Sequence, residues 1–238
     1  MAANPRLSVV VPAFDEQDRL PGSLDVVLPY LESLGCEYEL IVVDDGSTDG
    51  TLEVMRRAES ERPGVRVVAL KPNRGKGRAL AEGVAASRGD LVLISDADFS
   101  TPIEELPKLQ AAIDAGADVA IGSRGKRESR VEVSQPIYRV LMGKGFNLIV
   151  QAVLLPGLWD TQCGFKLFRG EVARELFIGL RTEGFGYDFD VLFRAKRARY
   201  RIAEVPVRWI NSPSSRVSPI SDSWEMLIHV IRLRLSSR

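Results

Sequence analysis

Two aspartates separated by one residue follow a short apolar run, and their types and spacing are suited to metal chemistry. Asp96 and Asp98 stand directly after residues 91–94 (Leu-Val-Leu-Ile) and Ser95. In an extended segment, residues two apart project to the same side, so both carboxylates would face one hard cation. Mg²⁺ or Mn²⁺ suits such oxygen ligands and takes its remaining ligands from water and substrate phosphates. Taken alone, the motif could instead end a strand or cap a helix.

Polar loops follow two other apolar runs at comparable positions. Residues 12–16 (Pro-Ala-Phe-Asp-Glu) follow the run 7–11, and residues 44–47 (Asp-Asp-Gly-Ser) follow the run 39–43. In open parallel sheets, ligands bind outside the carboxyl ends of the strands. The sequence therefore predicts one site assembled from three loops that lie far apart in the chain.

The elements that must position these loops alternate between strand-like and helix-like segments. We expect strands at 7–11, 39–43, 65–70, 91–94 and 118–121, and helices at 23–34, 51–62, 78–87 and 102–115. An apolar run without alternation, such as 91–94, is typical of a parallel strand that is covered on both faces. The pattern predicts an α/β fold with a doubly wound, mostly parallel, Rossmann-like sheet.

Composition limits the class of protein. The chain has 238 residues, with 32 Lys and Arg against 32 Asp and Glu, which predicts one soluble globular domain and argues against a nucleic-acid binder. Cys36 and Cys163 predict reduced thiols in a cytosolic protein. No secretory signal is expected, and the longest apolar stretch, 146–155, is far shorter than the ~20 residues of a membrane-spanning helix.

The zero net charge hides an uneven distribution. Residues 1–60 carry 4 basic and 12 acidic side chains, a net charge of −8, whereas residues 194–238 carry 10 and 3, a net charge of +7. A basic C-terminal part indicates either an anionic partner or a solvated basic surface, and the count does not separate the two.

The three loops together resemble the family-two glycosyltransferases of the GT-A fold, over nearly the whole chain. Residues 160–168 (Asp-Thr-Gln-Cys-Gly-Phe-Lys-Leu-Phe) are similar to the polyprenyl-phosphate sugar transferases of that family, especially the dolichyl-phosphate glucosyltransferases. Further matches lie at 122–124 (Gly-Ser-Arg), 204–206 (Glu-Val-Pro) and 215–217 (Ser-Arg-Val). The resemblance implies a catalytic domain over residues 1–220 and a C-terminal amphipathic helix over 221–238. It also implies transfer of a hexose, with glucose favoured, from a nucleotide diphosphate sugar to a polyprenyl or dolichyl phosphate, with inversion to a β-linkage.

The resemblance also assigns residues to the donor site and the metal site. Ser100 stands where the mannosyl relatives carry a glutamine ligand, and a serine side chain is shorter. The expected nucleotide-sugar site is Pro12, Ala13, Phe14, Glu16, Val43, Asp45, Lys76, Asp96, Ala97 and Asp98, and the expected ligands of Mg²⁺ or Mn²⁺ are Asp96, Asp98 and Ser100.

The acceptor chemistry follows from charge. A lipid phosphate carries roughly 1.5 to 2 negative charges at neutral pH and can attack without a general base, which agrees with a chain whose one histidine is His229. Guanidinium forks match phosphate oxygens, so Arg124 and Arg216 are candidates to grip the phosphates. Asp188 and Asp190 match acidic positions near the family's acceptor pocket, as a base, an orienting partner or a structural salt bridge. The catalytic set is therefore Asp98, Arg124, Arg216, Asp188 and Asp190, and the acceptor set is Arg130, Arg139 and Arg216.

Membrane contact is expected from amphipathic surface. Trp224, Leu227, Ile228, Ile231 and Leu235 fall on one helical stripe, and residues 137–155 are apolar around much of a helix. These segments predict peripheral attachment at the cytoplasmic face of a membrane, with core packing or a homo-oligomer contact as the alternatives.

Other functions stay open at this point. They are a GDP-mannose-dependent transferase of the same kind, a soluble saccharide acceptor, and a non-catalytic protein that binds nucleotide sugars. A sugar nucleotidyltransferase should carry a glycine-rich loop where residues 12–16 stand. Lys76 lacks the earlier glycine of a P-loop, which disfavours an ATPase.

Overall fold

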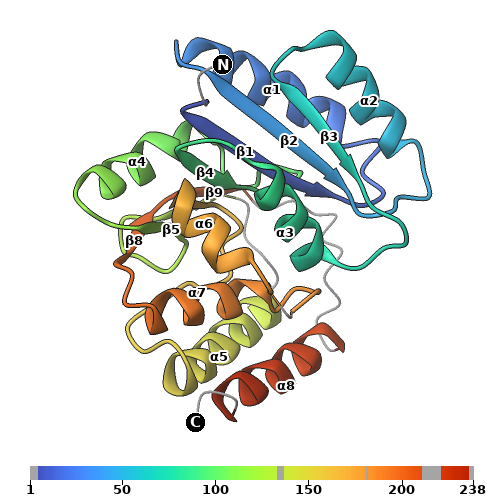
Figure 1. Ribbon diagram of the computed structural model, residues 1–238. Helices are drawn as coiled ribbons and strands as arrows, with labels where there is room; N and C mark the ends of the chain where they lie inside the picture. The colour runs from blue at the N-terminus through green and yellow to red at the C-terminus, as the bar shows by residue number, and fades with distance from the viewer. Residues whose placement is uncertain (1–4, 133–136, 181, 211–220, 236–238) are drawn as a thin grey trace.

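A central twisted sheet with helices on both faces forms the body of the molecule (Figure 1). The computed structural model describes residues 5–132, 137–180, 182–210 and 221–235, without the side chains of 137–142, 144 and 221–225. Within these residues the main sheet has seven strands in the order β3-β2-β1-β4-β7-β5-β8, and a separate pair joins β6 to β9. Neighbours in the main sheet are parallel except for β7, which is antiparallel to β4 and β5.

The strands and helices have the following bounds. The strands are β1 (Leu7–Ala13), β2 (Tyr38–Asp44), β3 (Val65–Ala69), β4 (Leu91–Ile94), β5 (Val119–Ser123), β6 (Arg130–Glu132), β7 (Lys166–Arg169), β8 (Ile202–Pro206) and β9 (Arg208–Ile210). The helices are α1 (Leu20–Ser33), α2 (Thr51–Glu61), α3 (Lys76–Ala86), α4 (Leu106–Asp114), α5 (Ile137–Val153), α6 (Gly170–Phe177), α7 (Tyr187–Arg197) and α8 (Ser221–Leu235), with the short 3₁₀ turn η1 (Ile103–Glu105) before α4.

Two hydrophobic cores cover the two faces of the sheet. Successive strand residues point to opposite faces, so Val10 belongs to one core while Val9 and Val11 belong to the other. The core around Val10 takes side chains from α3, α5, α6, α7 and α8, and the opposite core takes them from α1, α2 and α4. Because both faces are covered, the central strands are mostly apolar, and the predicted α/β fold with a mostly parallel sheet is confirmed.

The second half of the chain departs from the simple alternation. In the sheet, β7 lies between β4 and β5, although it follows both in the sequence. It has four residues and is antiparallel to both neighbours. Its residues Lys166–Arg169 read as a short mixed run that no periodicity marks as a strand. The five strands expected from the sequence are all present, and β6, β7, β8 and β9 were not predicted.

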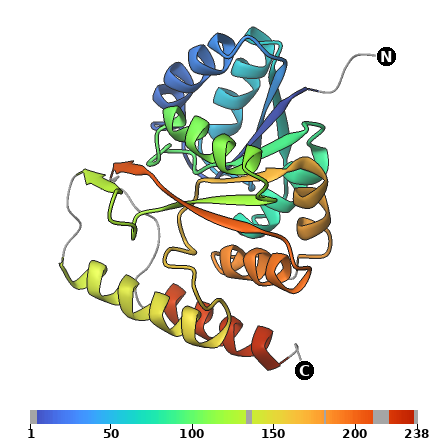
Figure 2. The ribbon, with the colours of Figure 1, turned by 90° about the vertical axis from the view of Figure 1, so that its left-hand side faces the viewer.

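Helices α5 and α8 lie side by side below α7, as Figures 1 and 2 both show. Met226 and Val230 of α8 are buried in the core, whereas Ile231 and Leu235 are 49% and 64% exposed. Ile231 and Leu235 belong to the expected apolar stripe and are nevertheless exposed. Met226 and Val230, which the stripe did not include, are the α8 residues that pack into the core. None of the helices in the described part of the chain is both long and apolar enough to cross a bilayer.

Candidate active site

The loops after β1, β2 and β4 meet at the carboxyl edge of the sheet, as predicted. Strand β1 pairs with β2 on one side and β4 on the other, so the strand order reverses around β1. The Asp45 N–H donates to the Ala13 carbonyl oxygen at 2.9 Å, and the Ser95 N–H donates to the Val10 carbonyl oxygen at 3.1 Å. These bonds hold the three loops at the position where open α/β sheets bind ligands.

The Asp-Ala-Asp segment forms a turn rather than an extended strand. The Phe99 N–H donates to the Asp96 carbonyl oxygen at 3.1 Å, and Phe99 has a φ of 42°. The argument that the two carboxylates project alike from an extended segment is therefore wrong, because β4 ends at Ile94. Each carboxylate has its own partner instead: Asp98 Oδ1 accepts from the Ser100 N–H at 3.0 Å, and Asp96 forms an ion pair with Lys76.

Lys76 joins the two aspartates electrostatically. Burial alone would lower the pKa of its ammonium group, but the carboxylates of Asp96, Asp188 and Asp98 raise that pKa above its ordinary value. In the reverse direction, burial would raise the pKa of Asp96, while Lys76 and the more distant Lys166 and Arg124 lower it. Asp96 is thus held ionised by its pairing with Lys76 and by the further cations Lys166 and Arg124.

Asp45 organises the loop that carries Lys76. Its carboxylate accepts from the Arg74 N–H at 3.0 Å and the Gly75 N–H at 2.8 Å, and burial raises its pKa. Gly75 has a φ of 94°, and a β-carbon there would lie 2.6 Å from the Glu183 carbonyl oxygen. Glycine therefore permits the close approach of the loops 71–77 and 182–186.

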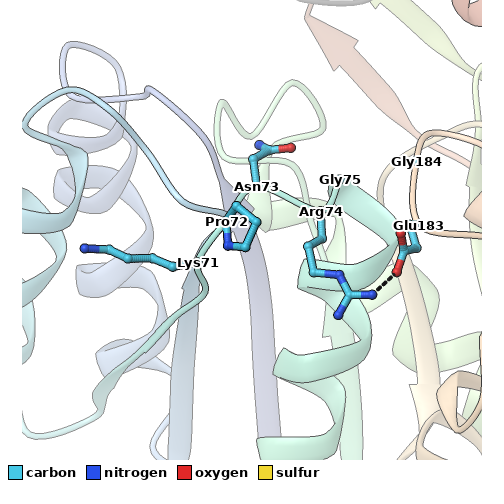
Figure 3. A pocket seen from close by; sticks show the side chains of 7 residues that line it. All are labelled: Lys71, Pro72, Asn73, Arg74, Gly75, Glu183 and Gly184. Atoms are coloured by element: carbon cyan, nitrogen blue, oxygen red, sulfur yellow. Dashed lines mark hydrogen bonds and ion pairs between the residues drawn. The ribbon is translucent and has the colours of Figure 1, made fainter.

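A cavity of about 670 Å³ opens between these two loops (Figure 3). Residues 71–75 and 183–184 line it, and the guanidinium group of Arg74 is paired with Glu183 at 2.5 Å. Lys71 points away from that pair. The cavity lies beside Gly75, the residue that directly precedes Lys76.

The first loop is joined to the aspartate turn through Arg19. Glu16 is buried, its N–H lies 2.6 Å from Thr51 Oγ1, and its carboxylate binds the Arg19 guanidinium group. Arg19 also interacts electrostatically with Asp98. Among the expected nucleotide residues, Pro12 and Ala13 end β1, and Val43 lies in the buried part of β2.

Asp188 and Asp190 occupy the buried first turn of α7. Asp188 forms an ion pair with Lys166, whose Nζ also donates to the Cys163 carbonyl oxygen at 2.5 Å. Asp190 accepts from Thr182 Oγ1 at 2.8 Å. Of the roles that the sequence left open for Asp188, the contacts favour the structural salt bridge over a general base.

Arg124 follows the end of β5 and is held by the carboxylate of Asp160. Its Nε and one terminal nitrogen donate to the two oxygens of Asp160 at 2.7 and 2.9 Å. Burial would lower the pKa of Arg124, and Asp160 raises it. The guanidinium carbon lies 5.3 Å from the centre of the Trp209 ring, a cation–π distance.

The acceptor candidates are not brought together. Arg130 is exposed on β6, and no contact within the described residues joins it to the cluster around Asp96. Arg139 lies in α5, but its side chain is outside the described part. Arg216 lies outside the described residues altogether, so its predicted role stays a prediction.

The residues present fit a hard divalent cation. Asp96 keeps 38% of its side chain exposed, and Asp98 is half-buried, so both carboxylates remain accessible from solvent although each has a partner within the protein. Within the residues that the structure describes, no group of three or more His, Cys, Asp or Glu side chains gathers. Such a pair suits an ion that takes its other ligands from a diphosphate, and Ser100 contributes a backbone bond to Asp98.

Sequence reasoning missed four residues that organise the site, Arg19, Asp160, Lys166 and Glu204. Asp160, Lys166 and Glu204 lie within motifs that carry the family resemblance, but their partners are up to 81 residues away in the chain. Only the fold brings them together, so spacing alone contains no signal for their roles.

Comparison with known proteins gives one family. Residues 8–177 match the Glycosyl transferase family 2 model. The chain is 36% identical to the dolichyl-phosphate beta-glucosyltransferase of Dictyostelium discoideum, over 96% of this chain and 73% of that relative. It is also 36% identical to the Homo sapiens protein of the same name, over 97% of this chain and 75% of the relative.

Solved structures show the same fold. Glucosyl-3-phosphoglycerate synthase from Mycobacterium tuberculosis aligns with a TM-score of 0.70 and 26% identity, covering 97% of this chain and 80% of that one. A complex of that enzyme with Mn²⁺, UDP-glucose and phosphoglyceric acid aligns with a TM-score of 0.68 and 25% identity, covering 98% and 79%.

Proposed function

Because the chain belongs to glycosyl transferase family 2, we propose that it transfers glucose from UDP-glucose to dolichyl phosphate or a related polyprenyl phosphate. It is a glycosyltransferase, and relatives that cover most of its length carry the name dolichyl-phosphate beta-glucosyltransferase. The observation that carries the proposal is the group of charged side chains at the carboxyl edge of the sheet, where Lys76 pairs with Asp96, Asp98 acts electrostatically on Lys76, and Arg124 acts electrostatically on Asp96.

The donor side is built to hold a nucleotide diphosphate. The loops of Glu16 and Asp45 are fixed by hydrogen bonds between backbone N–H groups and side-chain oxygens, so they are organised before a nucleotide binds. Lys76 supplies a partly buried positive charge beside Asp96. A divalent ion at Asp96 and Asp98, with Mn²⁺ or Mg²⁺ proposed, would neutralise charge that develops on the leaving diphosphate.

The acceptor phosphate is itself the nucleophile. Its oxygen forms a bond to the anomeric carbon while the bond from that carbon to the diphosphate oxygen breaks, and the bonding pair leaves with UDP. Because a phosphate monoester is largely a dianion at neutral pH, no proton has to be removed first. Attack from the face opposite UDP inverts the centre and gives the β-linkage. The pairing of Asp188 with Lys166 agrees with a reaction that needs no carboxylate base.

A soluble phosphorylated acceptor is the second candidate. The similar Mycobacterium tuberculosis enzyme was crystallised with UDP-glucose and phosphoglyceric acid, which also offers a phosphate. GDP-mannose remains the rival donor, since the described loop contacts do not distinguish uracil from guanine.

A direct assay tests the proposal. Purified protein with Mn²⁺ or Mg²⁺ and dolichyl phosphate is given radiolabelled UDP-glucose or GDP-mannose, and the organic phase is counted. We expect label from UDP-glucose to enter the lipid, at a rate at least tenfold above that from GDP-mannose. Transfer from GDP-mannose alone would replace the donor, and nucleotide binding without turnover on any acceptor would indicate a binding protein.

We also propose that the α5–α8 face attaches peripherally to the cytoplasmic surface of a membrane. Leu148 and Ile149 on α5 are exposed, as are Ile231 and Leu235 on α8, the helix that packs against α5. Arg232 and Arg234 add cations, which the anionic cytoplasmic leaflet attracts by about 1 kcal/mol per residue. A homo-oligomer contact through the same face is the alternative.

Liposome flotation tests the membrane proposal. The variant Ile231→Asp/Leu235→Asp changes exposed side chains and leaves the buried Met226 and Val230 in place, unlike a truncation. On vesicles of phosphatidylcholine with one-fifth phosphatidylserine, we expect bound protein to fall at least fivefold. Val26→Asp, at an exposed site on α1, is the matched control. Equal binding of the variant and the wild type would remove α8 from the membrane contact.

A further inference from the structure

We infer that Asp160 is a positioning residue, which presents the guanidinium group of Arg124 to the acceptor phosphate. The inference rests on the proposed function, because it takes Arg124 as the group that meets the phosphate. Asp160 grips Arg124 at three points: the side-chain Nε, one terminal nitrogen, and the Arg124 N–H at 2.8 Å. Backbone and side chain of the arginine are thus fixed by one carboxylate.

The ion pair with Asp160 leaves one terminal nitrogen of the Arg124 guanidinium group without a hydrogen-bond acceptor among the described residues. Asp160 takes Nε and Nη2, and among the described residues no acceptor is bonded to Nη1. The Arg124 side chain is 30% exposed, whereas the Asp160 side chain is 9% exposed. Arg124 is therefore the more accessible partner of the pair, and Nη1 is the nitrogen that its bonds to Asp160 leave for a phosphate oxygen.

Asp160 is itself held by Glu204 from the neighbouring strand β8. Glu204 accepts from the Asp160 N–H at 2.8 Å, from the Trp159 N–H at 3.1 Å and from Ser123 Oγ at 2.8 Å. Since Ser123 directly precedes Arg124, Glu204 joins both ends of the ion pair. A guanidinium group held in this way loses little further freedom when a phosphate binds.

The ion pair of Arg124 and Asp160 also lies near the aspartates that follow β4. Arg124 follows β5 and acts electrostatically on Asp96, the carboxylate that faces Lys76. Trp209 covers the guanidinium group with its ring, so Trp209 and Asp160 both restrict Arg124.

The test is steady-state kinetics of Asp160→Asn with dolichyl phosphate and UDP-glucose. Asparagine keeps the size of the side chain and loses the charge and the second acceptor oxygen. We expect kcat/KM for the acceptor to fall about 10- to 100-fold, the effect typical of residues that orient a functional group, while the KM for UDP-glucose changes less than twofold. Glu61→Gln, which removes a carboxylate from an exposed arginine pair on α2, is the control.

A double substitution separates positioning from structure. In an Arg124→Ala background, Asp160→Asn should cost less than threefold in activity, because the group that Asp160 positions is gone. Equal costs in both backgrounds, or a donor KM that rises as much as the acceptor KM, would overturn the inference. If Asp160→Asn does not fold, the test uses Arg124→Lys, because lysine keeps the positive charge but cannot form the two parallel hydrogen bonds of a guanidinium group. Unchanged acceptor kinetics in Arg124→Lys would then overturn the positioning role of Asp160.

The inference and the proposed function fail in different ways. If the wild-type protein glucosylates phosphoglyceric acid and no lipid, the proposed acceptor is wrong, and the same comparison is made with that phosphate. Absence of transfer to either phosphate overturns both. Wild-type lipid transfer with an unaffected Asp160→Asn variant overturns the positioning role alone.

Discussion

The variant Asp98→Ala is expected to lose about 10³-fold or more in kcat. Asp98 contributes one of the two carboxylates that follow β4, and stabilisation of a leaving diphosphate by a bound metal is worth several kcal/mol, at about 1.36 kcal/mol per tenfold in rate. Its Oδ1 also accepts from the Ser100 N–H, so alanine removes both a charge and a support of the turn.

Asp98→Asn separates these two contributions. Asparagine retains an acceptor oxygen for the Ser100 N–H but carries no negative charge. If charge is the main contribution, Asp98→Asn should lose nearly as much kcat as Asp98→Ala, and Mn²⁺ binding in the presence of UDP, measured by calorimetry, should weaken in both. Retention of more than a tenth of the wild-type kcat by Asp98→Ala would exclude Asp98 from the metal site.

Replacement of Lys166 by methionine is expected to lower the free energy of unfolding by about 3–5 kcal/mol, which corresponds to a drop in Tm of about 6 °C or more. The Lys166 side chain is 1% exposed and that of its partner Asp188 is 8% exposed. Methionine fills a similar volume but removes the ammonium group that pairs directly with the buried Asp188 carboxylate, while the electrostatic interaction with Lys76 remains. The loss of that direct partner is the source of the lost stability.

The double variant Lys166→Met/Asp188→Leu is the matched control. It removes both charges, and replacement of a whole buried ion pair by apolar residues is commonly neutral or stabilising. We expect urea unfolding to show most of the lost stability restored in the double variant. A loss below about 1 kcal/mol in Lys166→Met would show that the pair contributes little.

Much of the fold was predictable because its first half follows local rules. The strands around Val10, Ile41 and Leu93 are apolar runs with both faces buried, and each is followed by a polar loop. Parallel topology then places those loops at one edge. Strand β7 was not predictable, since Lys166–Arg169 pairs with strands formed by residues 91–94 and 119–121, and no local pattern marks that insertion.

The sequence predicted which residues belong to the site better than it predicted the contacts that they make. Asp96, Asp98, Lys76 and Arg124 were all expected, yet each is engaged by a partner that spacing does not reveal. Arg124 illustrates the reason: Asp160 lies 36 residues further along the chain and reaches it only because the loop before β7 returns to the end of β5. The turn at Asp96 likewise depends on backbone bonding, which the two-residue spacing does not report.

The measurement that tests the central claim most directly offers two phosphate acceptors in one reaction. The protein receives radiolabelled UDP-glucose and Mn²⁺ together with dolichyl phosphate in vesicles and phosphoglyceric acid in solution. The product is then separated into organic and aqueous phases, and the linkage of the lipid product is determined. We predict β-linked glucosyl lipid in the organic phase as the main labelled product. Label confined to an aqueous glucosyl product, or an α-linked lipid, would contradict the proposed reaction.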